Sequence, residues 1–370
     1  MMISAQKTQF APREDGVKKR YTGEVVYIYG FDTAYEMSRE PVKQLMGQPV
    51  QPFAVDPTKR SPRTLSLYKP QMVRLPPLEQ KGPLGPVKLE RIIKFFPVGA
   101  VSITVRVPFE VERLEDLVVF HDLQVATRSL HDEARQLAED ARRELAPYFI
   151  RPVPYLAEEE AYTVFCLDAP VTNAEGLPMN AEAWFQTHRR QIAALLTQES
   201  DVRQLSKQEA EESTARYLSY YQNDLVVIDW DAALIVDERA DFDDPVYIME
   251  LANLQLAEME AYDRLLDESL DRSYRDLANR SLRNRSHVMH ELKELRIDMT
   301  RMSDELSNIT KFFGDWHLAR VYENLAARFH LGDWHRALDE KLQTLDDLYR
   351  VLQHDQTNRW MLLLEATIVL

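Results

Sequence analysis

The sequence contains little cysteine and little glycine. Cys166 is the only cysteine among 370 residues, which excludes an intramolecular disulfide framework and a zinc or iron–sulfur site built from cysteines. The ten glycines are scattered and form no phosphate-binding loop, and no Gly-x-Ser-x-Gly nucleophile motif occurs. No internal run reaches the roughly eighteen apolar residues of a membrane span. The usual sequence signs of a particular reaction are therefore missing.

The composition is that of a folded, acidic protein. Hydrophobic residues make up 45% and charged residues 28%, and the net charge is −15. Residues 1–90 hold 14 Lys/Arg against 9 Asp/Glu, so the excess of acid lies in the rest of the chain. Binding to duplex DNA is disfavoured. The basic groups Lys18–Arg20 and Lys59, Arg60 and Arg63 could contact RNA or a ribosome, although solvated loop charge is the favoured interpretation.

The proline distribution divides the chain. Thirteen of 19 prolines precede residue 110, and only Pro245 follows Pro178. Because proline is costly inside helices, the front is expected to hold strands and loops and the back long helices. Residue patterns predict strands at 24–30, 88–96, 100–107 and 161–167, with helices at 33–46 and 114–145. This β-α-β-β-α-β order is that of a ferredoxin-like sandwich.

Three regions are expected. Residues 1–20 form a flexible leader, and residues 21–240 form an α/β part with a long Pro-rich connection at 47–87. That part also includes a helix at 181–198 and short strands at 217–221, 225–228 and 232–236. Residues 241–370 form a domain of long helices. The fold class is therefore α+β: a ferredoxin-like or similar α/β part followed by long antiparallel α-helices.

The last helix carries a coiled-coil pattern. Leu338, Leu342, Leu345 and Leu352 follow heptad spacing. A helix over 333–370 would be roughly 57 Å long at about 1.5 Å per residue, so it needs a partner helix, a second copy or a membrane. We expect these leucines to make a contact between copies. The apolar residues 360–370 predict either a buried helix end or the start of a membrane segment beyond Leu370, with the second favoured.

Two residue groups could carry chemistry. His287, His290 and Glu291 lie at i, i+3 and i+4 on one side of a predicted helix, a spacing that can hold a metal, but no further ligand lies nearby. Asp224, Asp229, Asp231 and Asp237 could act in acid–base chemistry or bind a cation, but turn and helix-cap roles are favoured. Cys166 lies in an apolar strand and is expected to be buried rather than nucleophilic. No cofactor is predicted.

Two segments resemble a known family. Phe312–Trp316, Tyr322, Leu325, Leu342 and Leu345 lead to Leu363-Leu364-Glu365, and Tyr221-Gln222-Asn223-Asp224 precedes an apolar strand. This arrangement is similar to that of the "required for meiotic nuclear division" family, also called the YagE-type domain of unknown function. The resemblance covers residues 215–370, and the motif residues are Asn223, Asp224, Tyr322, Leu364 and Glu365.

The resemblance implies a membrane segment after Leu370, and no enzymatic activity is established for the family it points to. The expected function is a membrane-anchored scaffold or tether that self-associates through its long helices. A location on the cytoplasmic face of a bacterial membrane is preferred to a mitochondrial one. Two alternatives stay open: the soluble part of a channel or transport assembly, and an RNA- or translation-linked module.

Overall fold

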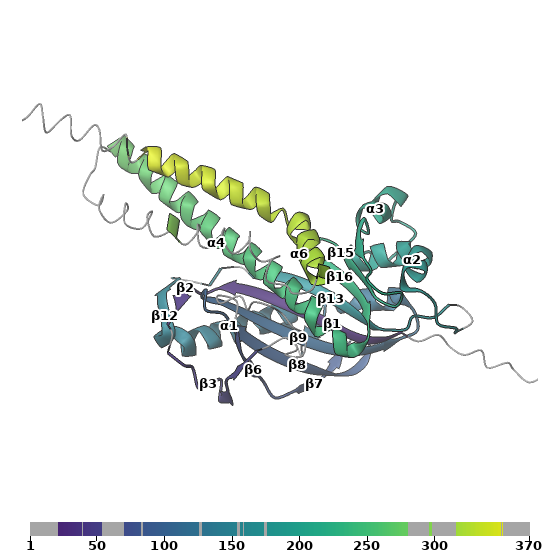
Figure 1. Cartoon of the computed structure of the whole chain (residues 1–370). Coiled ribbons are helices and arrows are strands. Elements are labelled where there is room, and N and C mark those ends of the chain that lie inside the picture. The colour runs from purple at the N-terminus through teal and green to yellow at the C-terminus, as the bar shows by residue number, and fades with distance from the viewer. Residues whose placement is uncertain are drawn as a thin grey trace, which may run out of the picture.

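The computed structural model describes residues 21–38, 40–53, 70–82, 84–125, 128–153, 156–157, 159–173, 176–279, 296–297, 316–348 and 350. The expected leader at 1–20 and the apolar residues 360–370 lie outside these ranges. Within them, strands dominate the front of the chain and helices the back, as the proline distribution predicts (Figure 1).

The centre of the molecule is a ten-stranded sheet in the order β14-β15-β16-β13-β1-β9-β8-β6-β5, with β7 also paired to β8. Its pairs are antiparallel except β13 with β16. The strands are β1 (Tyr21–Asp32), β5 (Gln51–Pro52), β6 (Gln71–Arg74), β7 (Leu78–Gly82), β8 (Gly85–Phe95), β9 (Ala100–Val111), β13 (Glu160–Asp168), β14 (Arg216–Leu218), β15 (Leu225–Ile228) and β16 (Ala232–Asp237). Three short pairs lie outside it: β2 (Ala34–Met37) with β12 (Phe149–Pro152), β3 (Gln44–Leu45) with β4 (Gln48–Pro49), and β10 (Gln124–Val125) with β11 (Arg128–Ser129).

Helices lie on both faces of the sheet. They are α1 (Leu130–Leu145), α2 (Ala181–Leu196), α3 (Lys207–Glu212), α4 (Asp243–Asn279), α6 (Trp316–Arg328) and the helical residues 331–348, with 3₁₀ turns η1 (Leu114–Phe120), η2 (Ala146–Tyr148) and η3 (Arg239–Asp241). Local signals set several starts. Ser129 caps α1 by accepting a hydrogen bond from the Asp132 amide at 3.1 Å, and Asn180 and Ser206 cap α2 and α3 in the same way.

Strand alternation creates two apolar cores. Successive side chains of a strand point to opposite faces. In β1, Val25 and Tyr27 therefore join the core under α1 and α2, whereas Val26 and Ile28 join the core under α4, α6 and residues 331–348. A helix layer covers each face, so the architecture is an α/β/α sandwich.

The ferredoxin-like expectation is wrong. The predicted helix at 33–46 is replaced by the short strands β2 and β3, and the described residues between β1 and β8 contain no helix. The sheet also has ten strands, whereas the β-α-β-β-α-β order supplies only four. The expected connection at 47–87 also contributes strands β5, β6 and β7 to the sheet.

The predicted helix at 114–145 is likewise interrupted. Only residues 130–145 form an α-helix, because η1 and the β10–β11 turn occupy the first part. In this first part Leu114, Leu117 and Phe120 are buried at a spacing of three, which suits a 3₁₀ turn as well as an α-helix.

The expected domain of long antiparallel helices is also wrong. The first half of α4 lies on the sheet as the outer layer of the sandwich, because Ile248, Leu251 and Leu254 complete the second core. The chain from α6 through residues 331–348 runs beside α4 in the same direction, since Tyr322 of α6 contacts Gln255 and, further along both segments, Lys341 contacts Asp263. Figure 1 shows both helices extending past the same end of the sheet.

Candidate functional site between the sheet and the helices

A strip of polar side chains lies between α4 and the sheet. On β9, odd-numbered residues enter the apolar core under α1, whereas Ser102, Thr104 and Arg106 face α4. Glu250 of α4 is fully buried and accepts hydrogen bonds from Ser102 Oγ at 2.6 Å and Thr104 Oγ1 at 3.2 Å. Its other oxygen pairs with the Lys94 ammonium of β8. We call these residues, with Arg106, the α4 polar strip.

The two ends of the α4 polar strip are held by cations. Arg106 bridges Glu24 of β1, at 3.0 Å, and Asp243 at the start of α4. At the other end, Lys94 Nζ lies 4.3 Å from the ring centre of Phe53. Burial lowers the pKa of Lys94, and the Glu250 carboxylate opposes that change. The strip is a closed set of mutual contacts that fixes α4 to three strands, because a buried charge is stable only when it is paired.

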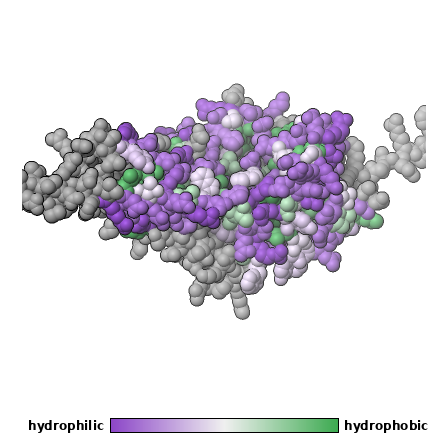
Figure 2. Space-filling model, turned by 90° about the horizontal axis from the view of Figure 1, so that it is seen from above, coloured by the Kyte–Doolittle hydropathy of each residue, from purple (hydrophilic) through white to green (hydrophobic). Residues whose placement is uncertain are grey.

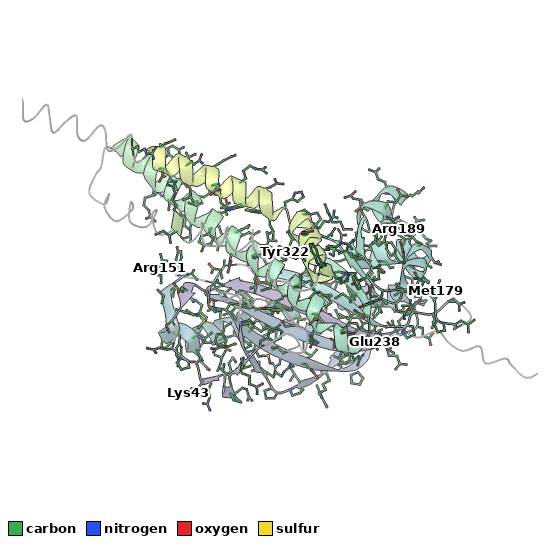
Figure 3. The ribbon with its side chains drawn as sticks, viewed as in Figure 1. Lys43, Arg151, Met179, Arg189, Glu238 and Tyr322 are labelled. Atoms are coloured by element: carbon green, nitrogen blue, oxygen red, sulfur yellow. The ribbon has the colours of Figure 1, made fainter. Side chains whose placement is uncertain are left out.

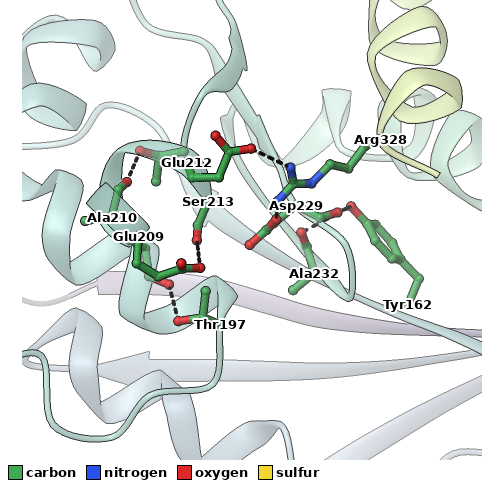
Figure 4. A network of polar contacts seen from close by, with 11 residues as sticks. Tyr162, Thr197, Glu209, Ala210, Glu212, Ser213, Asp229, Ala232 and Arg328 are labelled. Atoms are coloured by element: carbon green, nitrogen blue, oxygen red, sulfur yellow. Dashed lines mark hydrogen bonds and ion pairs between the residues drawn. The ribbon is translucent and has the colours of Figure 1, made fainter. Parts of the chain in front are cut away.

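A second buried ion pair fastens α6. The Arg328 guanidinium binds Asp229, which follows β15, and contacts Glu212 at 3.2 Å (Figure 4). Tyr162 of β13 donates its hydroxyl toward the backbone oxygens of Asp229, at 3.0 Å, and Ala232, at 3.1 Å. The end of α6 is thereby joined to the turn between β15 and β16. Burial raises the pKa of Asp229 and Arg328 opposes this rise.

An acidic cavity of about 260 Å³ lies beside this junction. It forms where β13, the β15–β16 turn, α4 and the chain after α6 meet. Its lining combines carboxylates with aromatic rings: Glu160, Ala161, Trp230, Asp231, Asn253, Leu256, Glu260, Phe329 and Trp334. Asn253 is buried and donates its side-chain amide to the backbone oxygen of Glu160 at 2.8 Å, which ties α4 to the first residue of β13.

The carboxylates of the acidic cavity repel one another. Burial raises the pKa of Glu160 to about 8, with Glu260 and Asp231 adding to the rise and Arg264 opposing it. Arg264 lies 3.8 Å from Glu260. It also opposes the burial that raises the pKa of Asp32 to about 7. At neutral pH Glu160 is therefore mostly protonated. The Arg264 guanidinium is the positive charge that lowers the pKa of both Glu160 and Asp32.

The acidic residues singled out in the sequence have separate roles. Asp224 is buried and accepts hydrogen bonds from the backbone amides of Tyr220, at 2.6 Å, and Tyr221, at 2.9 Å, which fixes the turn before β15. Asp229 pairs with Arg328, and Asp231 lines the acidic cavity. Asp237 lies outside both sites and accepts a hydrogen bond from the Glu238 amide at 2.8 Å, and burial raises its pKa to about 6. Turn roles are thus confirmed for Asp224, while Asp229 also joins the β15–β16 turn to α6.

The other predicted positions are dispersed. Tyr322 lies on α6 and donates a hydrogen bond to Gln255 of α4 at 2.6 Å, within the helix layer (Figure 3). Asn223 is exposed in the turn that Asp224 holds. His287, His290, Glu291, Leu352, Leu364 and Glu365 lie outside the described residues. Within the described part of the chain, no group of three or more His, Cys, Asp or Glu side chains could hold a metal ion.

Three of the four seam leucines face the chain's own core. Leu338, Leu342 and Leu345 are almost fully buried in the apolar cluster shared with α4 and α6. In one chain they already have the partner helix that their spacing demands. Their use in a contact between copies stays a prediction. No helix among the described residues is long and apolar enough to cross a membrane.

Sequence reasoning missed the residues that join the layers. Lys94, Glu250 and Glu160 are far apart in sequence and match no motif. One signal was available: Glu250 and Asn253 interrupt the apolar face of α4, and Ser102, Thr104 and Arg106 make one face of β9 polar. Two polar stripes of this kind predict a buried polar contact only once the two elements are known to be neighbours.

The fold and these sites define an α/β/α sandwich domain whose polar chemistry lies between the sheet and one helix layer. A family model described as "Uncharacterized protein MJ0711, N-terminal domain" matches residues 22–243, and the chain belongs to that family. It is 29% identical over 156 residues to "Uncharacterized protein MJ0711" of Methanocaldococcus jannaschii, covering 41% of this chain and 48% of that protein. The match thus spans about half of this relative's length. No solved structure matches the chain.

The resemblance to the meiotic-division or YagE-type family is wrong, because the matching family is a different one. The quoted motifs have general structural causes. The Asn223-Asp224 pair makes a turn, and Tyr322, Leu342 and Leu345 mark the buried faces of helices. Such features recur wherever turns and packed helices occur.

Proposed function

We propose that this protein is a non-enzymatic scaffold in which the α/β sandwich is a base that carries a rigid helical arm. The arm consists of the second half of α4 and the helical residues 331–348. At about 1.5 Å per residue, the 37 residues of α4 are roughly 55 Å long, more than its contact with the sheet requires. The observation that carries the proposal is the α4 polar strip, because it fixes the first half of this long helix to β1, β8 and β9.

The arm is also joined along its own length. Lys341 contacts Asp263 and Asp267, each at 2.6 Å, and Leu342 and Leu345 fill the apolar contact between the two helices. At the base, Arg328 and Asn253 add further contacts to the sheet. A force on the arm would therefore reach the sheet through buried ion pairs rather than through a loop.

The residues with reactive groups support a non-enzymatic role. Cys166 is fully buried, and burial raises its pKa well above the usual range, which disfavours the thiolate. Lys94 and Glu250 contact each other beneath α4, where a substrate has no access. These groups stabilise the junction between layers.

We place the contact between copies on an exposed aromatic surface formed by Tyr220, Tyr221 and Trp316. These side chains are 58%, 71% and 82% exposed. Tyr220 packs against Tyr221 at 4.7 Å and against His317 at 5.8 Å, so the turn after β14 and the start of α6 form one surface. Exposed aromatic side chains are enriched at protein interfaces. Viewed from the helix side, the rest of the surface is mostly hydrophilic, with hydrophobic residues in separate patches (Figure 2).

Light scattering tests this proposal. We expect the purified chain to have the mass of at least two copies, and Tyr221→Ala combined with Trp316→Ala to shift it toward one copy. Leu84→Ala is the matched control, because Leu84 is 55% exposed near the opposite end of the sheet. A single-copy mass for the unchanged protein over a wide concentration range would contradict the scaffold.

Attachment to the cytoplasmic face of a membrane and a role in a channel assembly stay predictions, since residues 351–370 lie outside the described part. The RNA-linked alternative rests on Lys18–Arg20, Lys59, Arg60 and Arg63, which also lie outside it. Salt-dependent binding to RNA that Lys18→Glu and Lys19→Glu abolish would favour that alternative.

A further inference from the structure

The acidic cavity has an unusual combination of walls. Glu160 begins β13, Trp230 and Asp231 lie in the turn between β15 and β16, Glu260 lies on α4, and Trp334 follows α6. Its volume of about 260 Å³ is slightly below the roughly 300–1,000 Å³ of cavities for drug-sized ligands. A compact molecule fits this space better than a nucleotide or a folded partner.

The charge in the cavity is unbalanced. Three acidic side chains line it, one of them the mostly protonated Glu160, while Arg264 lies 3.8 Å from Glu260 and also acts on Asp32. Arg328 and His330 lie against Trp230, but Arg328 is bound to Asp229 and Glu212, and His330 contacts Asp333. The field at the centre of the cavity is therefore negative and favours a cationic guest.

The aromatic walls select the kind of cation. The ring faces of tryptophan attract organic cations and also pack against apolar carbon chains. Phe329 and Leu256 extend this apolar lining. A bare metal ion would instead need several oxygen ligands in a fixed shell, and the described residues contain no group of side chains that could form one.

We infer that the acidic cavity binds a small alkylammonium ion, with its charged head between Glu160, Glu260 and Asp231 and its carbon chain against Trp230 and Trp334. The ammonium donates up to three hydrogen bonds, one for each carboxylate. This site is independent of the proposed scaffold role, since it uses neither the exposed aromatic surface nor the α4 polar strip.

Binding would release a proton. With its pKa near 8, Glu160 carries a proton at pH 7, and an ammonium at the same place favours the carboxylate. Glu260, Asp231 and Arg264 are the charged groups that face Glu160 from α4 and the turn. The affinity should therefore rise with pH between about 6 and 8 and level off above it.

Calorimetric titration of the full chain with n-butylammonium tests the site. We expect saturable binding with release of up to one proton at pH 7, measured by comparing buffers of different ionisation enthalpy. Glu260→Gln should weaken binding at least about tenfold, because it removes one charge-assisted hydrogen bond. Asp271→Asn removes the same charge from an exposed position on α4 and should leave the affinity unchanged.

A second ligand identifies the source of the ammonium. Nα-acetyl-lysine N-methylamide presents the same alkylammonium as a protein side chain. Tighter binding of this compound than of butylammonium points to a lysine of a partner protein, and the reverse points to a free amine.

Glu160→Gln should fold normally, because it replaces an acid that is mostly neutral at pH 7. Loss of binding in this variant would therefore support the site. Absence of binding by both ligands at millimolar concentration, or equal affinity in Glu260→Gln, would overturn the inference.

Discussion

Lys94 of β8 and Glu250 of α4 form a buried ion pair although 156 positions separate them in the chain. The pair fixes the longest described helix to the sheet and has Ser102 and Thr104 as additional hydrogen-bond donors. Because both charges have lost water, each depends on the other for compensation.

Breaking this pair on one side should be costly. Glu250→Ala leaves the Lys94 ammonium and the Ser102 hydroxyl buried without their acceptor, and we expect a loss of roughly 3–5 kcal/mol in unfolding free energy by urea denaturation. Lys94→Met combined with Glu250→Leu removes both charges and should recover most of this loss. A double variant as unstable as Glu250→Ala would mean that packing, not charge, is the main term.

The control for that measurement is the exposed pair of Arg113 and Asp116. Its side chains are 70% and 30% exposed, and they lie three residues apart at 2.9 Å. Because surface ion pairs contribute little, Arg113→Ala should leave the unfolding free energy almost unchanged.

The acidic cavity should make stability depend on pH. The pKa of Glu160 is raised to about 8 in the folded chain and is near its ordinary 4.5 when unfolded. The folded state thus holds a proton that the unfolded state releases between these values, so stability should fall as pH rises from about 5 to 8. Asp32, with a pKa of about 7, acts in the same direction.

Glu160→Gln isolates this contribution. We expect the variant to be more stable than the unchanged protein at pH 8 and nearly equal at pH 4.5, measured by denaturation at a series of pH values. A parallel decline with pH in both proteins would show that other groups, such as Asp32, cause the effect.

We expect the seam leucines Leu338, Leu342 and Leu345 to stabilise the fold of a single chain. Leu345 is fully buried between α4 and the helical residues 331–348. Leu345→Asp places a carboxylate in this apolar contact and should cost at least about 3 kcal/mol. A normal unfolding midpoint together with a halved mass by light scattering would instead show that Leu345 contacts a second copy.

The Asp224 turn should be needed to present Tyr220 and Tyr221. Asp224→Ala removes the acceptor of two backbone hydrogen bonds, at 2.6 Å and 2.9 Å, and should cost about 1–3 kcal/mol. Faster amide hydrogen exchange at these two tyrosines is the specific readout. Asp224→Asn keeps one side-chain oxygen as an acceptor and should give an intermediate effect.

Several elements were predictable because their signals are local. The alternation in residues 100–107 predicts β9, and the apolar period after Asp243 predicts α4. Burial of Cys166 also followed from its apolar neighbours. The helix predicted at 33–46 failed because propensity alone could not register that this segment pairs as strands, β2 with β12 and β3 with β4.

The candidate sites were not predictable in the same way. Asp231 was singled out for its neighbours in sequence, but its partners in the acidic cavity are Glu160 and Glu260. The heptad leucines were expected to contact another chain, yet α4 supplies their partner surface in the same chain. In both cases the sequence pattern showed that a partner was needed and did not show which one.

By itself the sequence determined the polarity of each face, the positions of caps and turns, and the change from strands to helices along the chain. These properties depend on residues within a few positions of one another. Only the tertiary structure decided that β1 lies between β9 and β13, that α4 lies across the polar face of β9, and that Glu160 meets Glu260. Those relationships depend on contacts between distant residues, whose free energy is set by burial and charge pairing in the complete fold.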